Sequence, residues 1–189
     1  MNKTPSESTP LHDVKVWDIV VRIFHWALAL GVLLNLFVFE EGETLHQYSG
    51  YIVCGLVIAR ILWGFVGTHY ARFSEFFPTV EKVRHQMRSM ARGRNPVHVG
   101  HSPMGAVVMM AMGLAVLALA FTGFLMDTDQ FFGSELLEET HELIANGLMA
   151  LVFVHVIAAV VLSKVEGVNL VSAMVTGIKR FQKPVNGHK

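Results

Sequence analysis

Four long apolar runs, separated by polar segments, dominate the sequence. The runs cover about residues 19–39, 46–67, 104–126 and 141–163. A transmembrane helix needs about 20 predominantly apolar residues, and each run has this length. The pattern therefore predicts four membrane-spanning helices. Because the first run lacks an obvious small-residue cleavage site, we interpret it as a retained helix and not as a removed signal peptide.

Two of the polar segments contain apolar residues at helical spacing. Within residues 68–102 these are Val80, Val83, Met87 and Met90, and within residues 168–181 they are Val171, Met174, Val175, Ile178 and Phe181. Such spacing predicts amphipathic helices that lie on the membrane surface. A solvated basic loop is the alternative for residues 68–102. Residues 1–16, which are polar and contain two prolines, are expected to form a flexible tail.

The composition supports a membrane protein. The chain has 189 residues, 52% of them hydrophobic, and its mean hydropathy is +0.46, which is too apolar for an ordinary soluble domain. Fifteen basic residues balance fifteen acidic ones, so the net charge gives no indication of nucleic-acid binding. Cys54 is the only cysteine, which excludes an intrachain disulfide and a Cys-x-x-Cys-His haem attachment.

The distribution of charge predicts the orientation of the spans. Every Lys and Arg lies in the terminal segments, in residues 68–102, or at the neighbouring span ends, whereas the loops at 40–43 and 127–139 carry only acidic charge. The positive-inside rule then places both termini and residues 68–102 in the cytoplasm. We expect an all-α integral membrane four-helix bundle with cytoplasmic N- and C-termini and surface-lying amphipathic helices.

Two histidines in the fourth apolar run provide the main clue to function. His141 and His155 are fourteen residues apart. In an α-helix this spacing corresponds to a rise of about 21 Å and falls about 40° short of four full turns, so both imidazoles face one side at different depths. An imidazole inside a membrane is costly unless it is paired or coordinated, and each of these two therefore needs a partner.

Two further histidines match these depths. His25 lies about six residues into the first, outward-running span, in the cytoplasmic half with His155, and His46 opens the second span near the outer face with His141. Two opposed imidazoles at each of two levels would suit two haems b with bis-histidine ligation. Zinc is less suitable because its sites usually have three or four protein ligands.

Other functions for these histidines remain open from the residues alone. Each imidazole, taken alone, could be an ordinary buried histidine satisfied by a hydrogen bond. A proton or metal transporter that uses the four histidines as a relay is the competing functional class. The absence of Asp or Glu deep within the spans makes such a relay less favoured.

Three more residues are candidates for a cofactor site. Arg22 and Arg60 lie near the cytoplasmic ends of their spans, where they could bind haem propionates or a quinone carbonyl, or simply anchor the helices at the interface. Gly50 follows His46 by one helical turn and would leave room for a ring, or would serve only helix packing. The pair His98-x-x-His101 lies in a polar loop without further obvious ligands, so we do not expect a metal there.

Several motifs together resemble the family of bacterial cytochrome b561 and nickel-hydrogenase b-type cytochrome subunits. These are KVWDIVVRIFHW at 15–26, LHQYSGY at 45–51, LWGFVG at 62–67, GHSPMG at 100–105, LEETH at 137–141 with His155, and NLVSAMVTG at 169–177. The resemblance implies a four-helix cytochrome with two haems b that exchanges electrons with the quinone pool in the bacterial inner membrane. It assigns His25, His46, His141 and His155 as the haem ligands.

The resemblance also sets the expected organisation and partners. A cytoplasmic tail at 1–16 would precede a dihaem cytochrome b domain at 17–164, and residues 165–189 would form a cytoplasmic amphipathic helix and basic tail. The redox partner on the outer face would be a hydrogenase, another dehydrogenase or a c-type cytochrome, which the acidic loops would attract through a basic surface. A stand-alone superoxide:quinone oxidoreductase is the alternative activity within the family.

Overall fold

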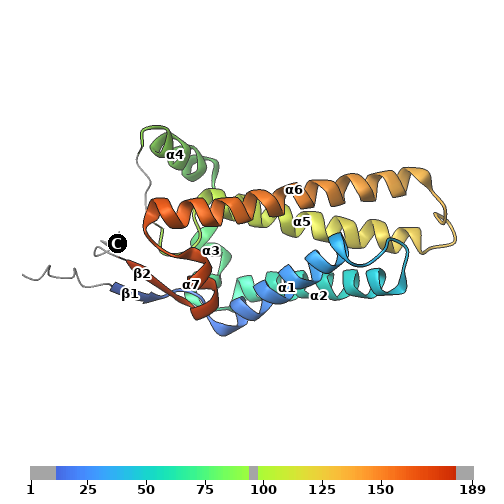
Figure 1. Cartoon of the computed structure of the whole chain (residues 1–189), viewed down its shortest axis with the longest axis horizontal. Coiled ribbons are helices and arrows are strands. Elements are labelled where there is room, and N and C mark those ends of the chain that lie inside the picture. The colour runs from blue at the N-terminus through green and yellow to red at the C-terminus, as the bar shows by residue number, and fades with distance from the viewer. Residues whose placement is uncertain (1–11, 94–97, 182–189) are drawn as a thin grey trace, which may run out of the picture.

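A computed structural model describes residues 12–93 and 98–181 of the chain. Four long helices run along its length, and each is long and apolar enough to cross a membrane (Figure 1). They are α1 (Ile19–Phe37), α2 (Thr44–Val66), α5 (Pro103–Met126) and α6 (Glu135–Glu166). The four predicted spans are therefore confirmed as helices.

The helix α6 is longer than the fourth apolar run predicted. Its first turn lies in a segment that was expected to be part of an acidic loop, and it contains Glu135 and Glu138. Negative side chains at a helix N-terminus are stabilised by the partial positive charge of the free backbone N–H groups. The helix ends at Gly167, which has a φ of 64°. With 32 residues, α6 extends past the apolar core at both ends.

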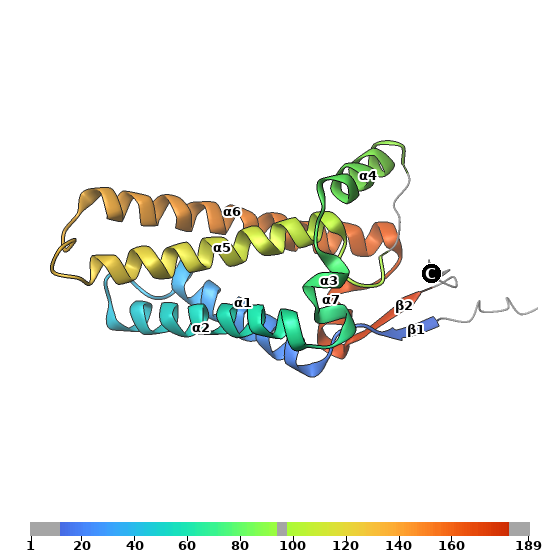
Figure 2. The ribbon, with the colours of Figure 1, turned by 180° about the vertical axis from the view of Figure 1, so that it is seen from behind.

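The spans pack in sequence rather than as a closed ring. The extensively contacting pairs are α1 with α2, α2 with α5, and α5 with α6 (Figure 2). Val53 and Val57 of α2, Val116 of α5 and Leu148 of α6 form the buried apolar cluster that joins the last three of these helices. Packing against α5 therefore sets the position of α6 relative to α2.

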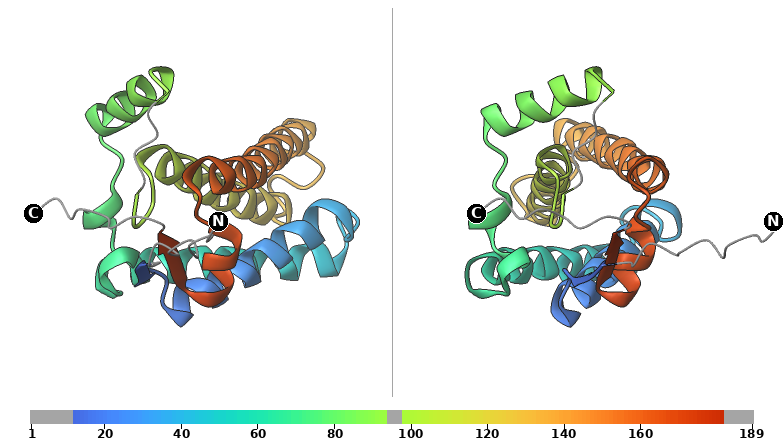
Figure 3. Two further views of the ribbon diagram at one scale, coloured as in Figure 1. Left: turned by 60° about the vertical axis from the view of Figure 1, so that its left-hand side comes forward. Right: turned by 90° about the vertical axis from the view of Figure 1, so that its left-hand side faces the viewer.

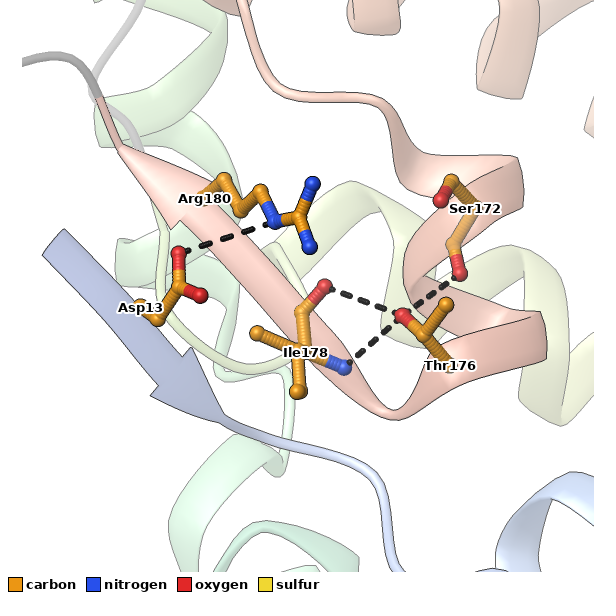
Figure 4. A network of polar contacts seen from close by, with 5 residues as sticks. All are labelled: Asp13, Ser172, Thr176, Ile178 and Arg180. Carbon is orange, nitrogen blue, oxygen red and sulfur yellow. Dashed lines mark hydrogen bonds and ion pairs between the residues drawn. The ribbon is translucent and has the colours of Figure 1, made fainter. Parts of the chain in front are cut away.

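One end of the bundle is closed by a short sheet that the sequence pattern did not predict. The strands β1 (His12–Lys15) and β2 (Ile178–Phe181) pair antiparallel, with His12 opposite Phe181 and Lys15 opposite Ile178. An ion pair joins the strands, with Arg180 Nε 3.7 Å from an Asp13 carboxylate oxygen (Figure 4). The expected flexible tail is thus wrong for residues 12–15, while residues 1–11 lie outside the described part of the chain.

The second predicted surface helix is also shorter than expected. The helix α7 (Leu170–Thr176) ends where Gly177 adopts a φ of 84°, so Ile178 and Phe181 belong to β2 and not to a continuous helix over 168–181. The Thr176 hydroxyl donates to the Ser172 carbonyl at 2.9 Å and accepts the Ile178 N–H at 3.2 Å (Figure 4). This turn redirects the chain from α7 into the strand. The expected basic tail at 182–189 lies outside the described residues.

The connection between α2 and α5 lies at the same end as the sheet. It contains a 3-10 turn η1 (His69–Ala71), the short helix α3 (Phe73–Phe76) and the predicted helix α4 (Val80–Ala91), which projects from the bundle and contacts only α5 extensively among the four spans (Figure 3). Only Gln86 of α4 is buried, and its side-chain oxygen accepts the N–H of Met104 at 2.9 Å. Val80, Met87 and Met90 of α4 are exposed.

A second apolar cluster holds the sheet end together. It consists of Val16, Trp17, Val21, Ala71 and Ala173. Asp18 ties the start of α1 to the end of α2, because its carboxylate accepts the Val21 N–H at 2.8 Å and the Thr68 hydroxyl at 2.5 Å. Burial raises the pKa of Asp18, but these hydrogen bonds outweigh that effect and leave the pKa below its ordinary value.

Replacing Gly177 should destabilise this end of the molecule. In Gly177→Ala the new Cβ would clash with the Trp17 carbonyl, and an alanine would also be strained at the positive φ of this position. Gly42 has a φ of 78° with open space around it, so Gly42→Ala carries only the cost of the positive φ, about 1 kcal/mol. We expect Gly177→Ala to lower the thermal unfolding midpoint of the detergent-solubilised protein more than Gly42→Ala. Equal losses would contradict the described contact.

Candidate metal centres

The four predicted histidines form two pairs, each joining α6 to another span. His25 of α1 faces His155 of α6 with ring centroids 6.2 Å apart, and His46 of α2 faces His141 of α6 with centroids 6.3 Å apart. The rings are inclined by 48° and 56°, respectively. The structure thus brings together the same partners that the depth argument paired.

The two pairs lie at different levels of the bundle. His46 sits in the first turn of α2 and His141 in the second turn of α6, so this pair lies near the loops that join α1 to α2 and α5 to α6 (Figure 1). His25 and His155 lie closer to the end that carries the sheet. Fourteen residues of continuous helix separate His141 from His155, which is about 21 Å of rise.

The spacing within each pair suits one metal ion between two imidazoles. An imidazole nitrogen binds a first-row metal ion at about 2.0–2.1 Å and lies about 1.1 Å from its ring centre, so two rings on opposite sides of one ion have centroids about 6.2 Å apart. The observed values of 6.2 and 6.3 Å match this separation. Direct hydrogen bonding between the rings would need their nitrogens about 3 Å apart in line, which gives a shorter centroid separation of about 5 Å.

Thr122 of α5 fixes the orientation of the His141 ring. Its hydroxyl oxygen is 2.8 Å from His141 Nδ1 and lies 3.0 Å from the Ala118 carbonyl oxygen and 3.1 Å from that of Leu119. With its single proton directed to one of these carbonyls, the hydroxyl oxygen can accept the Nδ1 proton of His141. In that tautomer Nε2 of His141 is unprotonated, which is the state that a metal ligand requires.

Two other imidazoles of the set have polar atoms without partners in the described part of the chain. Nδ1 of His25 and Nδ1 of His46 are buried and make no hydrogen bond there. Buried polar groups in proteins are nearly always bonded, and an unsatisfied one calls for an explanation. At each level two imidazoles lie at a separation that suits a metal ion. This arrangement is consistent with a planar metal cofactor that is bound by one histidine on each face.

Gly50 lies on an open side of α2. A Cβ at this position would meet only the Asn35 side-chain amide, at 3.9 Å. No neighbouring helix packs closely against Gly50 in the described part of the chain, so the alternative role of this glycine, close helix packing, is not supported. Space beside Gly50, one turn below His46, is compatible with a bulky planar group.

The two arginines lie near the sheet end, with His25 and His155. Arg60 Nη2 donates to the Ala71 carbonyl at 3.2 Å, and its guanidinium lies 5.9 Å from the Phe73 ring centroid, so part of its function is structural. Its Nη1 is buried without a partner among the described residues, as is Nε of Arg22. Each arginine therefore retains a donor that a carboxylate or carbonyl of a bound group could accept.

A histidine that sequence reasoning set aside is enclosed at the same end. The His101 ring lies 4.5 Å from Trp17 and 4.6 Å from Phe76, measured between centroids. Burial, together with the positive charges of Arg60 and Lys179, lowers the pKa of His101 from 6.5 to about 3. Among residues 12–93 and 98–181, no three or more His, Cys, Asp or Glu side chains lie together so that they could hold a metal ion.

Lys179 of β2 anchors the loop before α5. Its ammonium donates to the His98 carbonyl at 3.0 Å and to the Gly100 carbonyl at 3.1 Å, although the side chain is almost wholly buried. Burial lowers the pKa of Lys179 to about 8, and Glu166 partly offsets this effect. Neither Lys179 nor Thr122 was identified from the sequence. The only sequence signal for Thr122 is a hydroxyl within an otherwise apolar span.

Comparisons with known proteins agree with the motifs. A family model described as prokaryotic cytochrome b561 matches residues 16–177. The chain is 26% identical to a probable Ni/Fe-hydrogenase B-type cytochrome subunit of Bradyrhizobium diazoefficiens, over 89% of this chain and 87% of that protein. It is also 26% identical to a protein of the same description from Azotobacter vinelandii, over 89% of each chain. No solved structure matches it.

The enclosed ring of His101 predicts a specific acid sensitivity. Because the folded-state pKa is about 3 and the ordinary value is 6.5, the unfolded chain binds a proton in this range that the folded chain does not, so stability falls as the pH drops from 6.5 towards 3. His101→Phe should remove this part of the loss, about 2–3 kcal/mol at pH 4.5. Thermal unfolding of both proteins at pH 7 and pH 4.5 measures it, and equal losses would contradict it.

Proposed function

This chain belongs to the prokaryotic cytochrome b561 family, and we propose that it is a dihaem b cytochrome that carries electrons across the bacterial inner membrane. The proposed route joins a redox partner on the outer face to the quinone pool. Family membership and the four apolar helices make the chain a multi-pass membrane protein of electron transfer. The observation that carries the proposal is the pair of imidazole couples with centroids 6.2 and 6.3 Å apart.

The chain would contribute ligands and positions. His25 and His155 would hold one haem, and His46 and His141 the other. When bound, the haems would supply reversible one-electron chemistry, with potentials set by axial ligands, burial and hydrogen bonds. Thr122 would keep Nε2 of His141 free for iron by accepting the proton on Nδ1. Because α6 supplies one ligand at each level, a single rigid helix would fix the distance between the two haems.

The charge pattern supports an orientation for this transfer. The sheet end, with residues 67–102 and both terminal strands, would face the cytoplasm under the positive-inside rule. The level of His46 and His141 would then face outwards, beside loops that carry Glu40, Glu41 and Asp127. Arg22 and Arg60 would lie at the inner level, where their unpartnered donors would suit a haem propionate or the carbonyl of a quinone.

The names of the relatives favour one outer partner. The similar proteins from Bradyrhizobium and Azotobacter are described as B-type cytochrome subunits of Ni/Fe-hydrogenase. We therefore favour a hydrogenase as electron donor over another dehydrogenase or a c-type cytochrome. Co-purification from native membranes tests this choice. A visible spectrum of the purified protein tests the cofactor itself, because a histidine-relay transporter would lack the reduced-minus-oxidised bands of haem b.

Substituting single ligands should remove one haem at a time. His46→Ala and His141→Ala should each lower the haem content from two to one per chain and should affect the same spectral component, whereas His25→Ala and His155→Ala should affect the other. Haem extraction and redox titration of the purified variants provide the measurement. The exposed His85→Ala of α4 serves as the control and should keep two haems. Two full equivalents in His141→Ala would reject the proposed pairing.

Removing the Thr122 hydroxyl should weaken only the outer site. Thr122→Val keeps the shape of the side chain but leaves His141 Nδ1 without its acceptor, and loss of such an outer-shell partner typically costs about 10–100-fold in metal affinity. Haem retention at the His46/His141 level after dilution in detergent is the readout. Thr140→Val, which removes a hydroxyl bonded to the Leu136 carbonyl, is the matched control. Equal retention in both variants would contradict a role for Thr122.

A further inference from the structure

An open groove of about 510 Å³ lies between α4 and the beginning of α5. Its apolar lining comes from Val80, Val83 and Met87 of α4 and from Val107 of α5, and two guanidinium groups, those of Arg84 and Arg88, also line it. The α4 residues are three, four, seven and eight positions from Val80, so they occupy one face of the helix. The groove therefore combines an apolar surface with two positive charges.

The groove lies at the level where α5 enters the membrane. Pro103 is the first residue of α5, and Val107 is only one turn further along this span. The bond from Met104 N–H to the Gln86 side chain fastens α4 beside that first turn. An occupant of the groove could thus place one part against the apolar membrane interior and another in the polar interface.

The two arginines of the groove form no ion pair within the described part of the chain. Ion pairs in residues 12–93 and 98–181 join His69 with Glu75 and Asp13 with Arg180, and neither involves Arg84 or Arg88. Val80 remains 79% exposed and Met87 55% exposed. Lys82 lies on the opposite face of the same helix, away from the groove.

We propose that this groove binds an anionic phospholipid of the surrounding membrane. The acyl chain would cover Val83, Met87 and Val107, and the phosphate would lie between Arg84 and Arg88. A phospholipid is favoured because it joins long apolar chains to a phosphate that guanidinium groups bind well, and because it is abundant in the membrane around the groove. This site is separate from the histidine pairs, and the inference does not depend on the proposed electron transfer.

Native mass spectrometry of the full chain in detergent tests the proposal. Phosphatidylglycerol and phosphatidylcholine with the same acyl chains are titrated separately, and phosphatidylglycerol is expected to bind more tightly. Each basic residue near an anionic lipid contributes roughly a fivefold factor in affinity, so Arg84→Gln with Arg88→Gln should weaken phosphatidylglycerol binding about 30-fold. The matched control Lys82→Gln should change it at most about twofold.

A second variant tests the apolar half of the site. Val83→Trp keeps both arginines but fills the groove, and it should also reduce phosphatidylglycerol binding. Equal effects of Lys82→Gln and of the double arginine variant, equal affinity for both lipids, or displacement of the lipid by inorganic phosphate would each overturn the proposal. A photoreactive side chain at Val83 in native membranes should form a phospholipid adduct, and a crosslink to a polypeptide instead would overturn it.

Discussion

An imidazole within a bilayer needs a partner, and α6 carries two imidazoles, those of His141 and His155, on one side. This requirement explains the arrangement of the other spans. His25 of α1 meets His155, and His46 of α2 meets His141, so imidazoles from two separate helices lie at a metal-sized distance from imidazoles of the same third helix.

The span without histidines makes this spacing possible. Helix α5 packs against both α2 and α6, and its Val116 belongs to the buried cluster that includes Val53 and Leu148. Helix α5 therefore sets the separation of α6 from α2, although it contributes no histidine to either pair. Thr122 adds a polar contact from the same helix, since its hydroxyl oxygen lies 2.8 Å from Nδ1 of His141.

The sequence was sufficient for those features that depend on local pattern. Apolar length determines the spans, and a spacing of fourteen residues in α6 determines that His141 and His155 share one side. The sheet could not be found in this way, because β1 and β2 pair across more than 160 residues and each has only four. Hydropathy also placed Glu135 in a loop, whereas a helix terminus favours acidic side chains. Thr122 was missed because a hydroxyl in a span commonly bonds its own backbone.

The pairing of β1 with β2 has a consequence for how the protein is made. The two strands flank all four spans in the chain, so the sheet can close only after the ribosome has completed α6 and α7. Until then Trp17 lacks the cover that Ala173 gives it, and Lys179 is not yet available to hold the loop before α5. Closure of this end thus follows the synthesis of all four spans. A chain arrested earlier would expose apolar surface that proteases and chaperones recognise.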